Sequence, residues 1–578
     1  MWFITDNSRY AQERHALGLL EADSPWLQNV QWRIERESLL LCVDAELIVK
    51  GVVRPVTMIY PEVFPSAPPS VRPLNSDVRW SGHQYGAGGE LCLEWRPDNW
   101  LSTVTGADVL ASAYRLLDAE APAGESSDRG YVLSAHNVSL GQEIRGQVSR
   151  LVLTPELLEQ VERAVVPLEA QFQFRLRDKT IIAWVSEITT ATEVVWKAQQ
   201  TPAGSLLKGA AEPGFILALA EGDPRIVRSR KGVINGAREL RAFLLGDKAP
   251  EFTQSEAIVL KQGEDIRAVY LSHEKDAVWE IAVIPPDPGA RLPERYAVLT
   301  EKTVAVVGCG SMGSKVAASL ARAGVRKFVL IDDDIFRPEN IVRNDLDWAD
   351  VALHKTDAVG ERIRRIRLDA SVDIRRQRLG GQESSGLFAG TMAALAKCDL
   401  IIDASGDPTA FNHASDVAYR FQRPMTWAVV FGGGFGGLLA RSRPGIDPSP
   451  QFARAIFDRW CNEQNVSPPP EATRSYEAIG DEGPMVADDS DVSVMAGHLA
   501  RFSIDLLSAP DDSRFEFSAY VIGFRKDWVF SAAFDTHPIN LGSPEERPPE
   551  AQMSVEEKLE ALTSLLGLLK PSNDPHPA

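Results

Sequence analysis

Apolar and polar positions recur with different periods along the chain. A helical period over residues 9–21 is followed by runs in which apolar and polar residues alternate one by one. These runs predict strands at 30–36, 39–49 and 53–60. A proline-rich segment at 60–69 follows, and we expect it to run over a surface because prolines cannot donate ladder hydrogen bonds. With a further helical period at about 105–119, the order predicts an α+β domain over residues 1–145.

The rest of the chain changes pattern twice. Residues 146–290 mix helical and strand signals without a chemical motif, and the prolines within 285–289 mark the clearest linker. From residue 291 to about 545, strand and helix patterns alternate as in a Rossmann-like α/β domain, and 570–578 are typical of a disordered tail. We therefore expect a multidomain α/β and α+β protein divided into 1–145, 146–290 and 291–578.

Composition supports this division and limits the partners. The chain has 578 residues, more than one hydrophobic core usually supports. Its net charge of -19 disfavours a nucleic-acid or anionic-membrane surface. The N-terminus lacks the charged region and long apolar run of a signal peptide, and the longest uncharged stretch, 424–440, is too glycine-rich for a membrane helix. We expect a soluble protein.

Cysteine usage indicates the redox compartment. The five cysteines lie far apart, and none forms the CxxC pair that a structural zinc site needs. They are Cys42, Cys92, Cys309, Cys398 and Cys461. Reduced thiols in the cytoplasm fit this pattern best.

A glycine-rich turn follows an apolar run at 304–307. Gly308, Gly310 and Gly313 fit a tight turn whose backbone amides face a phosphate at the start of a helix. The next apolar run, 327–331, ends in Asp332, which can hold ribose hydroxyls. This much suits NAD and ATP equally, because dehydrogenases carry the same glycine pattern.

Polar residues that follow Asp332 in the sequence distinguish ATP from NAD as the expected nucleotide. Asn340, Arg343 and Lys355 add an amide and two cations shortly after the ribose acid. Hydride transfer has no need of these cations, whereas adenylation builds charge on a leaving pyrophosphate. The alternative is that Arg343 and Lys355 are solvated surface charges.

The whole constellation resembles the ubiquitin-activating family with its ThiF-type adenylation domain, well over 296–440 and more loosely over 440–545. The resemblance implies ATP and Mg²⁺ as cofactors and a homodimer formed through this domain. It makes the three glycines the phosphate turn, Asp332 the ribose ligand, and Asn340, Arg343 and Lys355 the contacts to the triphosphate and the transition state. Either Asp403 or Asp407 corresponds to the family's magnesium-holding aspartate at a strand end.

Members of this family that form thioesters also need their own cysteine. After Asp403 this chain has only Cys461, which lies shortly before a loop-like Pro468-Pro469-Pro470. We expect Cys461 to sit on a mobile thiol-bearing segment; the alternative is a small buried residue beside Trp460. Cys309 is a poorer nucleophile candidate, because inside the glycine turn it would compete with phosphates for space.

Cys92 lies in a second candidate site, a loop rich in small and polar residues. Thiolate is strongly nucleophilic and suits transfer of an acyl group from one sulfur to another. The order of helix, strands, Tyr60-Pro61 segment, His83, Cys92, Trp100 and helix resembles the ubiquitin-conjugating fold. The resemblance covers about residues 5–145 and makes Cys92 the acyl-carrying thiol.

One departure from that family concerns the oxyanion. The family's His-Pro-Asn triplet reads His83-Gln84-Tyr85, so the asparagine that stabilises the oxyanion during lysine attack is missing. Gln84, Tyr85 or Asn99 can replace its hydrogen bond. His83 is expected to organise the loop and not to act as a base.

These observations predict a fused activating and conjugating enzyme of bacterial type. The order of its regions resembles fusions from cyclic-oligonucleotide antiphage (CBASS) operons, where a cGAS-like nucleotidyltransferase is the client, joined through its C-terminus to a target amine. One alternative keeps the chemistry with a ubiquitin-like protein as client. Another is an NAD-dependent Rossmann oxidoreductase with an appended domain, and a third makes residues 1–145 a binding module without acyl transfer.

Overall fold

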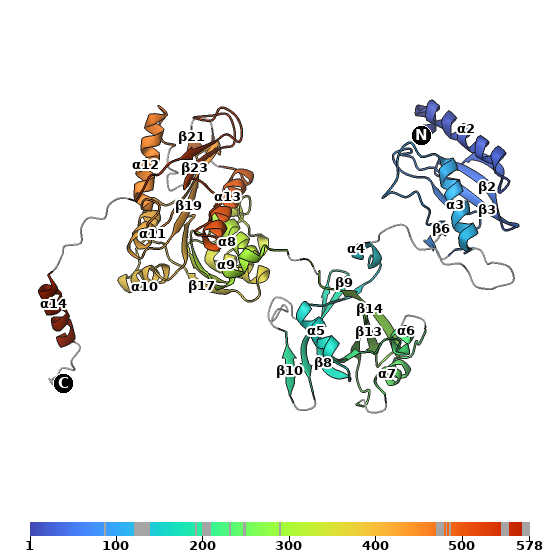
Figure 1. Cartoon of the computed structure of the whole chain (residues 1–578), viewed down its shortest axis with the longest axis horizontal. Coiled ribbons are helices and arrows are strands. Elements are labelled where there is room, and N and C mark those ends of the chain that lie inside the picture. The colour runs from blue at the N-terminus through green and yellow to red at the C-terminus, as the bar shows by residue number, and fades with distance from the viewer. Residues whose placement is uncertain are drawn as a thin grey trace. The chain divides into compact units, whose positions relative to one another are not determined.

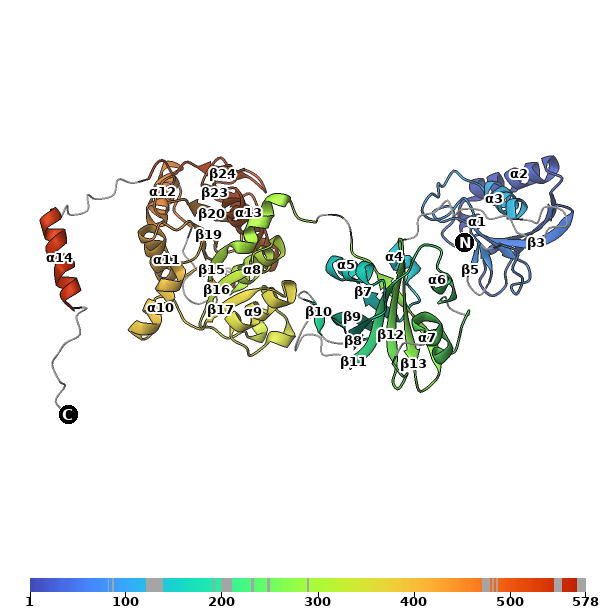
Figure 2. The same cartoon turned by 60° about the horizontal axis from the view of Figure 1, so that its bottom comes forward.

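The computed structural model describes most of the chain, which divides into two compact units, Met1–Gly146 and Gln147–Ala578 (Figures 1 and 2). The residues described are 1–81, 83–85, 88–120, 139–190, 193–198, 210–229, 233–246, 250–287, 289, 291–469, 479–480, 483–484, 487–544 and 554–568. The tail predicted at 570–578 lies outside them. None of the helices in these ranges has both the length and the apolarity needed to cross a bilayer.

The first unit is an antiparallel sheet covered by helices. The sheet has the order β1-β2-β3-β4, and the predicted strands correspond to its first three. The elements are α1 (Trp2–Thr5), α2 (Asn7–Asp23), β1 (Leu27–Ile34), β2 (Leu41–Val49), β3 (Val52–Ile59), β4 (Ser70–Pro73), β5 (Gln84–Tyr85), β6 (Glu90–Leu91), α3 (Gly106–Glu120) and α4 (Leu140–Glu143). Leu17 of α2, Leu47 and Met58 of the sheet and Leu110 of α3 are fully buried in one shared core.

A buried carboxylate ties the two long helices of this unit together. Glu13 of α2 accepts hydrogen bonds from the Tyr60 hydroxyl at 2.8 Å and from the Gly106 amide at 2.7 Å, and it pairs with Arg9 at 2.9 Å. A side chain at Gly106 would place Cβ 2.0 Å from the Tyr60 hydroxyl oxygen, so only glycine fits there. The contact fixes the start of α3, the helix against which the Cys92 loop packs.

The second unit begins with a sheet that closes on itself. Its strand order is β10-β9-β7-β14-β13-β12-β11-β8, and β8 also pairs with β9. The elements are β7 (Ser149–Val152), α5 (Pro155–Arg163), β8 (Leu168–Arg177), β9 (Thr180–Thr189), β10 (Val194–Lys197), β11 (Ala210–Ala218), α6 (Pro224–Arg228), α7 (Ala237–Leu245), β12 (Glu256–Gln262), β13 (Asp265–Ser272) and β14 (Ala277–Ile284). One core packs with α5 and another with α6 and α7, and β11, β12 and β13 contribute buried side chains to both cores.

The C-terminal part of this unit carries the Rossmann-like sheet that the sequence predicts, with the order β17-β16-β15-β18-β19-β20-β23-β24. The elements are η2 (Glu294–Glu301), β15 (Thr303–Val307), α8 (Ser311–Ala323), β16 (Lys327–Ile331), η3 (Pro338–Asn340), η4 (Trp348–Asp350), α9 (Lys355–Ile366), β17 (Ser371–Arg375), α10 (Ser385–Leu395), β18 (Leu400–Asp403), α11 (Pro408–Arg420), β19 (Met425–Val430), β20 (Gly436–Ser442), α12 (Pro450–Glu463), β21 (Ile479–Gly480), β22 (Gly483–Pro484), α13 (Asp489–Ser508), β23 (Ala519–Gly523), β24 (Thr536–Ile539) and α14 (Val555–Leu568).

Two layers of helices cover this sheet. The strands from β17 to β19 run parallel, and β20, β23 and β24 are antiparallel additions. Helices α8, α9 and α13 pack on one face and α10, α11 and α12 on the other (Figures 1 and 2). Burial on both faces explains why the parallel strands read as continuous apolar runs. The carboxyl ends of these strands share one edge, where such folds place their ligands.

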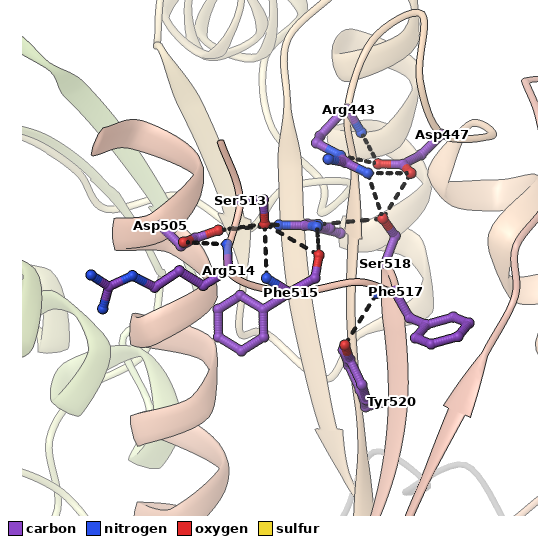
Figure 3. A network of polar contacts seen from close by, with 10 residues as sticks. Arg443, Asp447, Asp505, Ser513, Arg514, Phe515, Phe517, Ser518 and Tyr520 are labelled. Carbon is purple, nitrogen blue, oxygen red and sulfur yellow. Dashed lines mark hydrogen bonds and ion pairs between the residues drawn. The ribbon is translucent and has the colours of Figure 1, made fainter. Parts of the chain in front are cut away.

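A buried cation fixes the antiparallel side of the sheet. The Arg441 side chain on β20 is fully buried, and it donates to Ser513 Oγ at 2.8 Å and to the Phe515 carbonyl at 3.0 Å. Its charge faces Asp505 of α13 at 3.4 Å, and Figure 3 shows Asp505, Ser513, Phe515 and Ser518 in this network. A buried charge is tolerated when it is paired and hydrogen-bonded in this way. The network therefore fastens the segment before β23 to β20 and α13.

Candidate functional site

The glycine turn lies between β15 and α8. Gly308 has φ +87°, and a Cβ there would stand 2.6 Å from the Ser405 Cα. A Cβ on Gly313 would stand 1.8 Å from the Gly308 carbonyl oxygen, whereas one on Gly310 meets nothing within 4 Å. Gly308 and Gly313 are thus required by close backbone packing. Gly310 leaves open space before the N-terminus of α8, where backbone amides can face an anion.

Acidic residues gather at the end of β16. Asp332 accepts a hydrogen bond from the Cys309 amide at 2.7 Å and another from the Asp334 amide at 2.9 Å. Burial raises the pKa of Asp332, while these bonds and the charge of Lys355 act against the rise. The Lys355 ammonium group lies 2.5 Å from Asp334 Oδ2. Asp332 therefore stands directly against the glycine turn, with the Lys355 cation close by.

The loop that carries Arg343 is held by its own backbone and by α8. Asn340 Oδ1 accepts from the Arg337 amide at 3.0 Å, so this side chain caps the short η3 helix. Lys315 of α8 donates to the Arg343 carbonyl at 2.7 Å and pairs with Asp489 at 2.8 Å. Lys315 was missed in the sequence, where its position one turn after Ser311 on the phosphate helix is the available signal.

A cavity of about 230 Å³ opens beside the glycine turn. Of the residues singled out in the sequence, Arg343, Asp403 and Asp407 line it. The other lining residues are Ser311, Met312, Ala404, Gly406, Pro408, Phe411, Trp427, Ala428, Val429, Val430, Phe431, Gly432, Leu438, Arg454, Phe457, Asp458, Pro468, Pro469, Ala487 and Val492. The cavity combines a charged end near the carboxyl ends of the strands with a largely apolar wall.

The two aspartates of the cavity have different surroundings. Asp403, at the end of β18, accepts two hydrogen bonds from Ser405, and burial raises its pKa to about 6. Asp407 caps α11 through the Thr409 amide at 2.8 Å and binds Arg378 at 2.6 Å. Burial raises the pKa of Asp407, but the Arg378 and Thr409 hydrogen bonds outweigh it and hold that pKa below its ordinary value. Asp403 is thus the aspartate whose carboxylate is less committed to other protein groups.

Cys461 lies within α12 and not in a loop. Its side chain is fully buried, and burial, helped by the Asp458 charge, raises its pKa to about 11. Its neighbour Trp460 packs with Phe457 and Trp528. In this structure Cys461 therefore has the small buried position that the sequence left open as the alternative, and the expected mobile segment does not include it. Pro470 lies outside the described residues.

Cys92 is partly exposed and follows the β5–β6 hairpin. Its amide donates to the His83 carbonyl at 2.7 Å, and the Glu94 amide donates to Ser112 of α3 at 2.8 Å. Burial raises the pKa of the Cys92 thiol, and the charges of Asp98 and Glu90 add to the rise. None of these contacts stabilises the thiolate form of Cys92. The loop therefore leaves the thiol accessible but does not activate it as a nucleophile.

Two of the residues proposed to replace the missing asparagine, Gln84 and Asn99, make hydrogen bonds to backbone groups of the surrounding loops. Gln84 accepts from the Ser81 amide at 3.0 Å and donates to the Gly89 carbonyl at 2.8 Å. Asn99 accepts from the Arg96 amide at 2.8 Å and donates to the Glu94 carbonyl at 2.6 Å. Both side chains therefore shape loops around Cys92. The Tyr85 side chain lies outside what the structure describes.

Comparison with known proteins finds a matching family and several similar proteins. Residues 290–463 match the ThiF family. The ATP-dependent ubiquitin transferase-like protein Cap2 of Pseudomonas aeruginosa (strain BWHPSA011 / Pa011) is 26% identical over 32% of this chain and 35% of its own length. Its namesake from Escherichia coli (strain TW11681) is 34% identical over 20% of this chain and 19% of its own length. A crystal structure of E. coli MccB with ATP aligns at 17% identity with a TM-score of 0.33, covering 45% of this chain and 69% of that one.

Proposed function

The chain is an E1-like protein of the ThiF family, and on this premise we propose that it activates the C-terminal carboxylate of a client protein with ATP, carries it on Cys92 and joins it to an amine. The observation that carries the proposal is the cavity, because Arg343, Asp403 and the start of α8 line it together. The matched segments span only about a third and a fifth of the two Cap2 relatives. The activity of the whole chain is therefore our own inference.

The first step is adenylation. A carboxylate oxygen of the client forms a bond to the α-phosphorus of ATP, the bond to the bridging oxygen breaks, and pyrophosphate leaves with the electron pair. The amides before α8 face the phosphates, and Arg343 offsets the negative charge that grows on the leaving group. By their places in the family pattern, Asp332 is the proposed ribose ligand and Lys355 and Asn340 are the proposed phosphate contacts. These three residues are not among the described residues that line the cavity.

Mg²⁺ fits this site through a single carboxylate together with the phosphates. No group of three or more His, Cys, Asp or Glu side chains arranged to hold a metal occurs in the described parts of the chain. Mg²⁺ is usually bound by one or two carboxylates together with substrate phosphates. Asp403 would hold the ion, since Asp407 is engaged with Arg378 and Thr409. When bound, Mg²⁺ neutralises phosphate charge.

The second step moves the acyl group to sulfur. A thiolate attacks the acyl carbon, a thioester forms, and AMP leaves. By its place in the chain Cys461 is the proposed first carrier, and this role requires the end of α12 to open, because its thiol is buried. The alternative is direct transfer to Cys92, which is already partly exposed.

The third step is conjugation by a ubiquitin-conjugating-like region at residues 1–145. Its support is the helix, the meander β1–β4, and Cys92 immediately after a hairpin. Trp100 also anchors the proline-rich segment, donating to the Pro65 carbonyl at 2.8 Å. An amine of the target attacks the thioester carbon, an amide bond forms, and the Cys92 thiol leaves. Gln84, Tyr85 and Asn99 stay open as oxyanion donors, because an amide that donates one hydrogen bond, as Asn99 does, keeps a second N–H.

The proposed setting is the bacterial cytoplasm, where ATP and reduced thiols are available, and all five cysteines are free. The proposed client is a cGAS-like nucleotidyltransferase of a CBASS operon, and the proposed assembly is a homodimer formed through the ThiF-type domain. The support is the likeness to proteins named Cap2. A ubiquitin-like client remains the alternative. Arg343 beside the phosphate turn favours ATP over NAD.

A search for covalent adducts tests the proposal. Wild-type protein, Cys92→Ala and Cys461→Ala are incubated with ATP, Mg²⁺ and the proteins encoded by neighbouring genes, and intact masses are measured. We expect pyrophosphate release and an adduct that thiols remove. An adduct that is lost in Cys461→Ala but retained in Cys92→Ala supports the relay through Cys461, whereas an adduct lost only in Cys92→Ala supports direct transfer to Cys92. Pyrophosphate release without any adduct would support the adenylation step and contradict the conjugation step.

A further inference from the structure

Helix α12 contributes a second cation to the cavity. Arg454, Phe457 and Asp458 line it from this helix, whereas Arg343 comes from the loop after β16. Among the described residues that line the cavity, Arg343 and Arg454 are the cations. They belong to elements far apart in sequence, so the fold brings two positive charges to one chamber.

Each cation has a different neighbourhood. Arg343 shares the cavity with Ser311 and Met312 at the start of α8, which is the phosphate side. The Arg454 guanidinium lies over the Phe411 ring, 4.9 Å from its centre. Its charge also acts on Asp403, where it lowers the pKa against the larger effect of burial. Arg454 is therefore held against an aromatic wall, within electrostatic reach of the strand end where the reaction is placed.

The chemistry of adenylation needs cations for two different anions. The client's carboxylate must approach a triphosphate that carries the same sign of charge, and the wall that it passes includes Trp427, Phe431 and Phe457. A carboxylate loses hydration in such surroundings and needs a paired cation. Arginine is suited to this role, because its planar fork can bind both carboxylate oxygens.

We propose that Arg454 binds the terminal carboxylate of the client and directs it towards the α-phosphorus, while Arg343 serves the phosphates. The inference rests on the proposed function and adds a specificity-determining residue to it. Arg454 makes the site select a free chain-terminal carboxylate that arrives along an apolar wall.

Binding of peptide pairs tests this assignment without turnover. Fluorescent peptides with the last twelve residues of each neighbouring gene product are prepared as free acids and as C-terminal amides. We expect wild type to bind at least one free acid about 10- to 100-fold more tightly than its amide, the range of a charge-assisted pair. Arg454→Ala should bind acid and amide equally, and Arg454→Lys should recover part of the preference. Arg459→Ala, an exposed cation on the same helix, is the matched control.

Each result has a defined meaning. Arg454→Ala that keeps the preference, or a wild type that shows none, overturns the assignment. For the preferred peptide, pyrophosphate exchange should show a raised KM for peptide in Arg454→Ala with the KM for ATP nearly unchanged, which also shows that the variant is folded. If wild type prefers the acid, Arg454→Ala loses that preference and no peptide is adenylated, the proposed function fails while carboxylate binding by Arg454 stands.

Discussion

The loop of Cys92 and the cavity beside α12 present reactive groups in opposite ways. Around Cys92, polar side chains such as Gln84 and Asn99 hold the backbone and leave the thiol partly exposed. Around the cavity, charged side chains line a concave space, and the nearby thiol of Cys461 is fully buried. An exposed loop suits exchange between two large proteins, whereas a concave site can surround a small ligand such as a nucleotide. Cys461 therefore lies close to the cavity but cannot react until α12 opens.

Native-state alkylation is the strongest test of this contrast. We expect iodoacetamide to label Cys92 at least about 100-fold faster than Cys461, because a buried thiol reacts only when its helix opens. Peptide mapping by mass spectrometry measures both rates, and denaturant should expose all five cysteines. Comparable labelling rates for Cys92 and Cys461 in the native protein would contradict the difference in exposure of the two thiols. Fast labelling of Cys461 only with ATP and client would indicate that α12 opens during the reaction.

Removing the buried carboxylate of the cavity should have the next largest effect. Asp403→Asn should lower pyrophosphate release by about 100-fold, the size expected for one charged group near the transition state. Asp458→Asn lines the same cavity from α12 and should keep most of the activity. Equal losses in both variants would contradict a special role for Asp403.

The same carboxylate predicts a pH dependence. Burial raises the pKa of Asp403 to about 6 in the site without Mg²⁺, so the ionised form that can bind the ion dominates above that pH. At limiting Mg²⁺ concentration, activation should therefore fall as pH drops through this value. The charge of Arg454 and the Ser405 hydrogen bonds lower the pKa, whereas the charge of Asp407 raises it. Arg454→Ala should therefore move the acidic limb to higher pH. An unmoved limb of the pyrophosphate-release profile would show that another group controls it.

The smallest effect concerns the charges around Cys92. Asp98 raises the Cys92 pKa, so Asp98→Asn should speed its alkylation at neutral pH by about two- to fivefold, as expected for one partly screened charge. Asp23→Asn, in the same unit, is the control. A rate that does not change would assign the raised pKa to burial alone.

The local features of the nucleotide site could be predicted from the sequence. Gly313 is needed by a contact within one turn, Gly308 has a positive φ that favours glycine, and Asp332 follows its strand directly. Because parallel strands end at one edge, Arg343 and Asp403 could be expected near the same place, and both line the cavity. The state of Cys461 could not be predicted, since its burial depends on what packs against α12.

The alternation of elements, the Rossmann-like sheet and the glycine turn follow from the sequence, because periodicity and backbone sterics act over a few residues. The closure of the middle sheet through β8 and β9 and the meeting of Arg454 with Arg343 in one cavity depend on contacts between distant parts of the chain. Such contacts also bury Cys461 and leave Cys92 partly exposed. Burial, pKa and cavity lining depend on neighbours that lie far apart in the chain, so they cannot be predicted from the local sequence pattern.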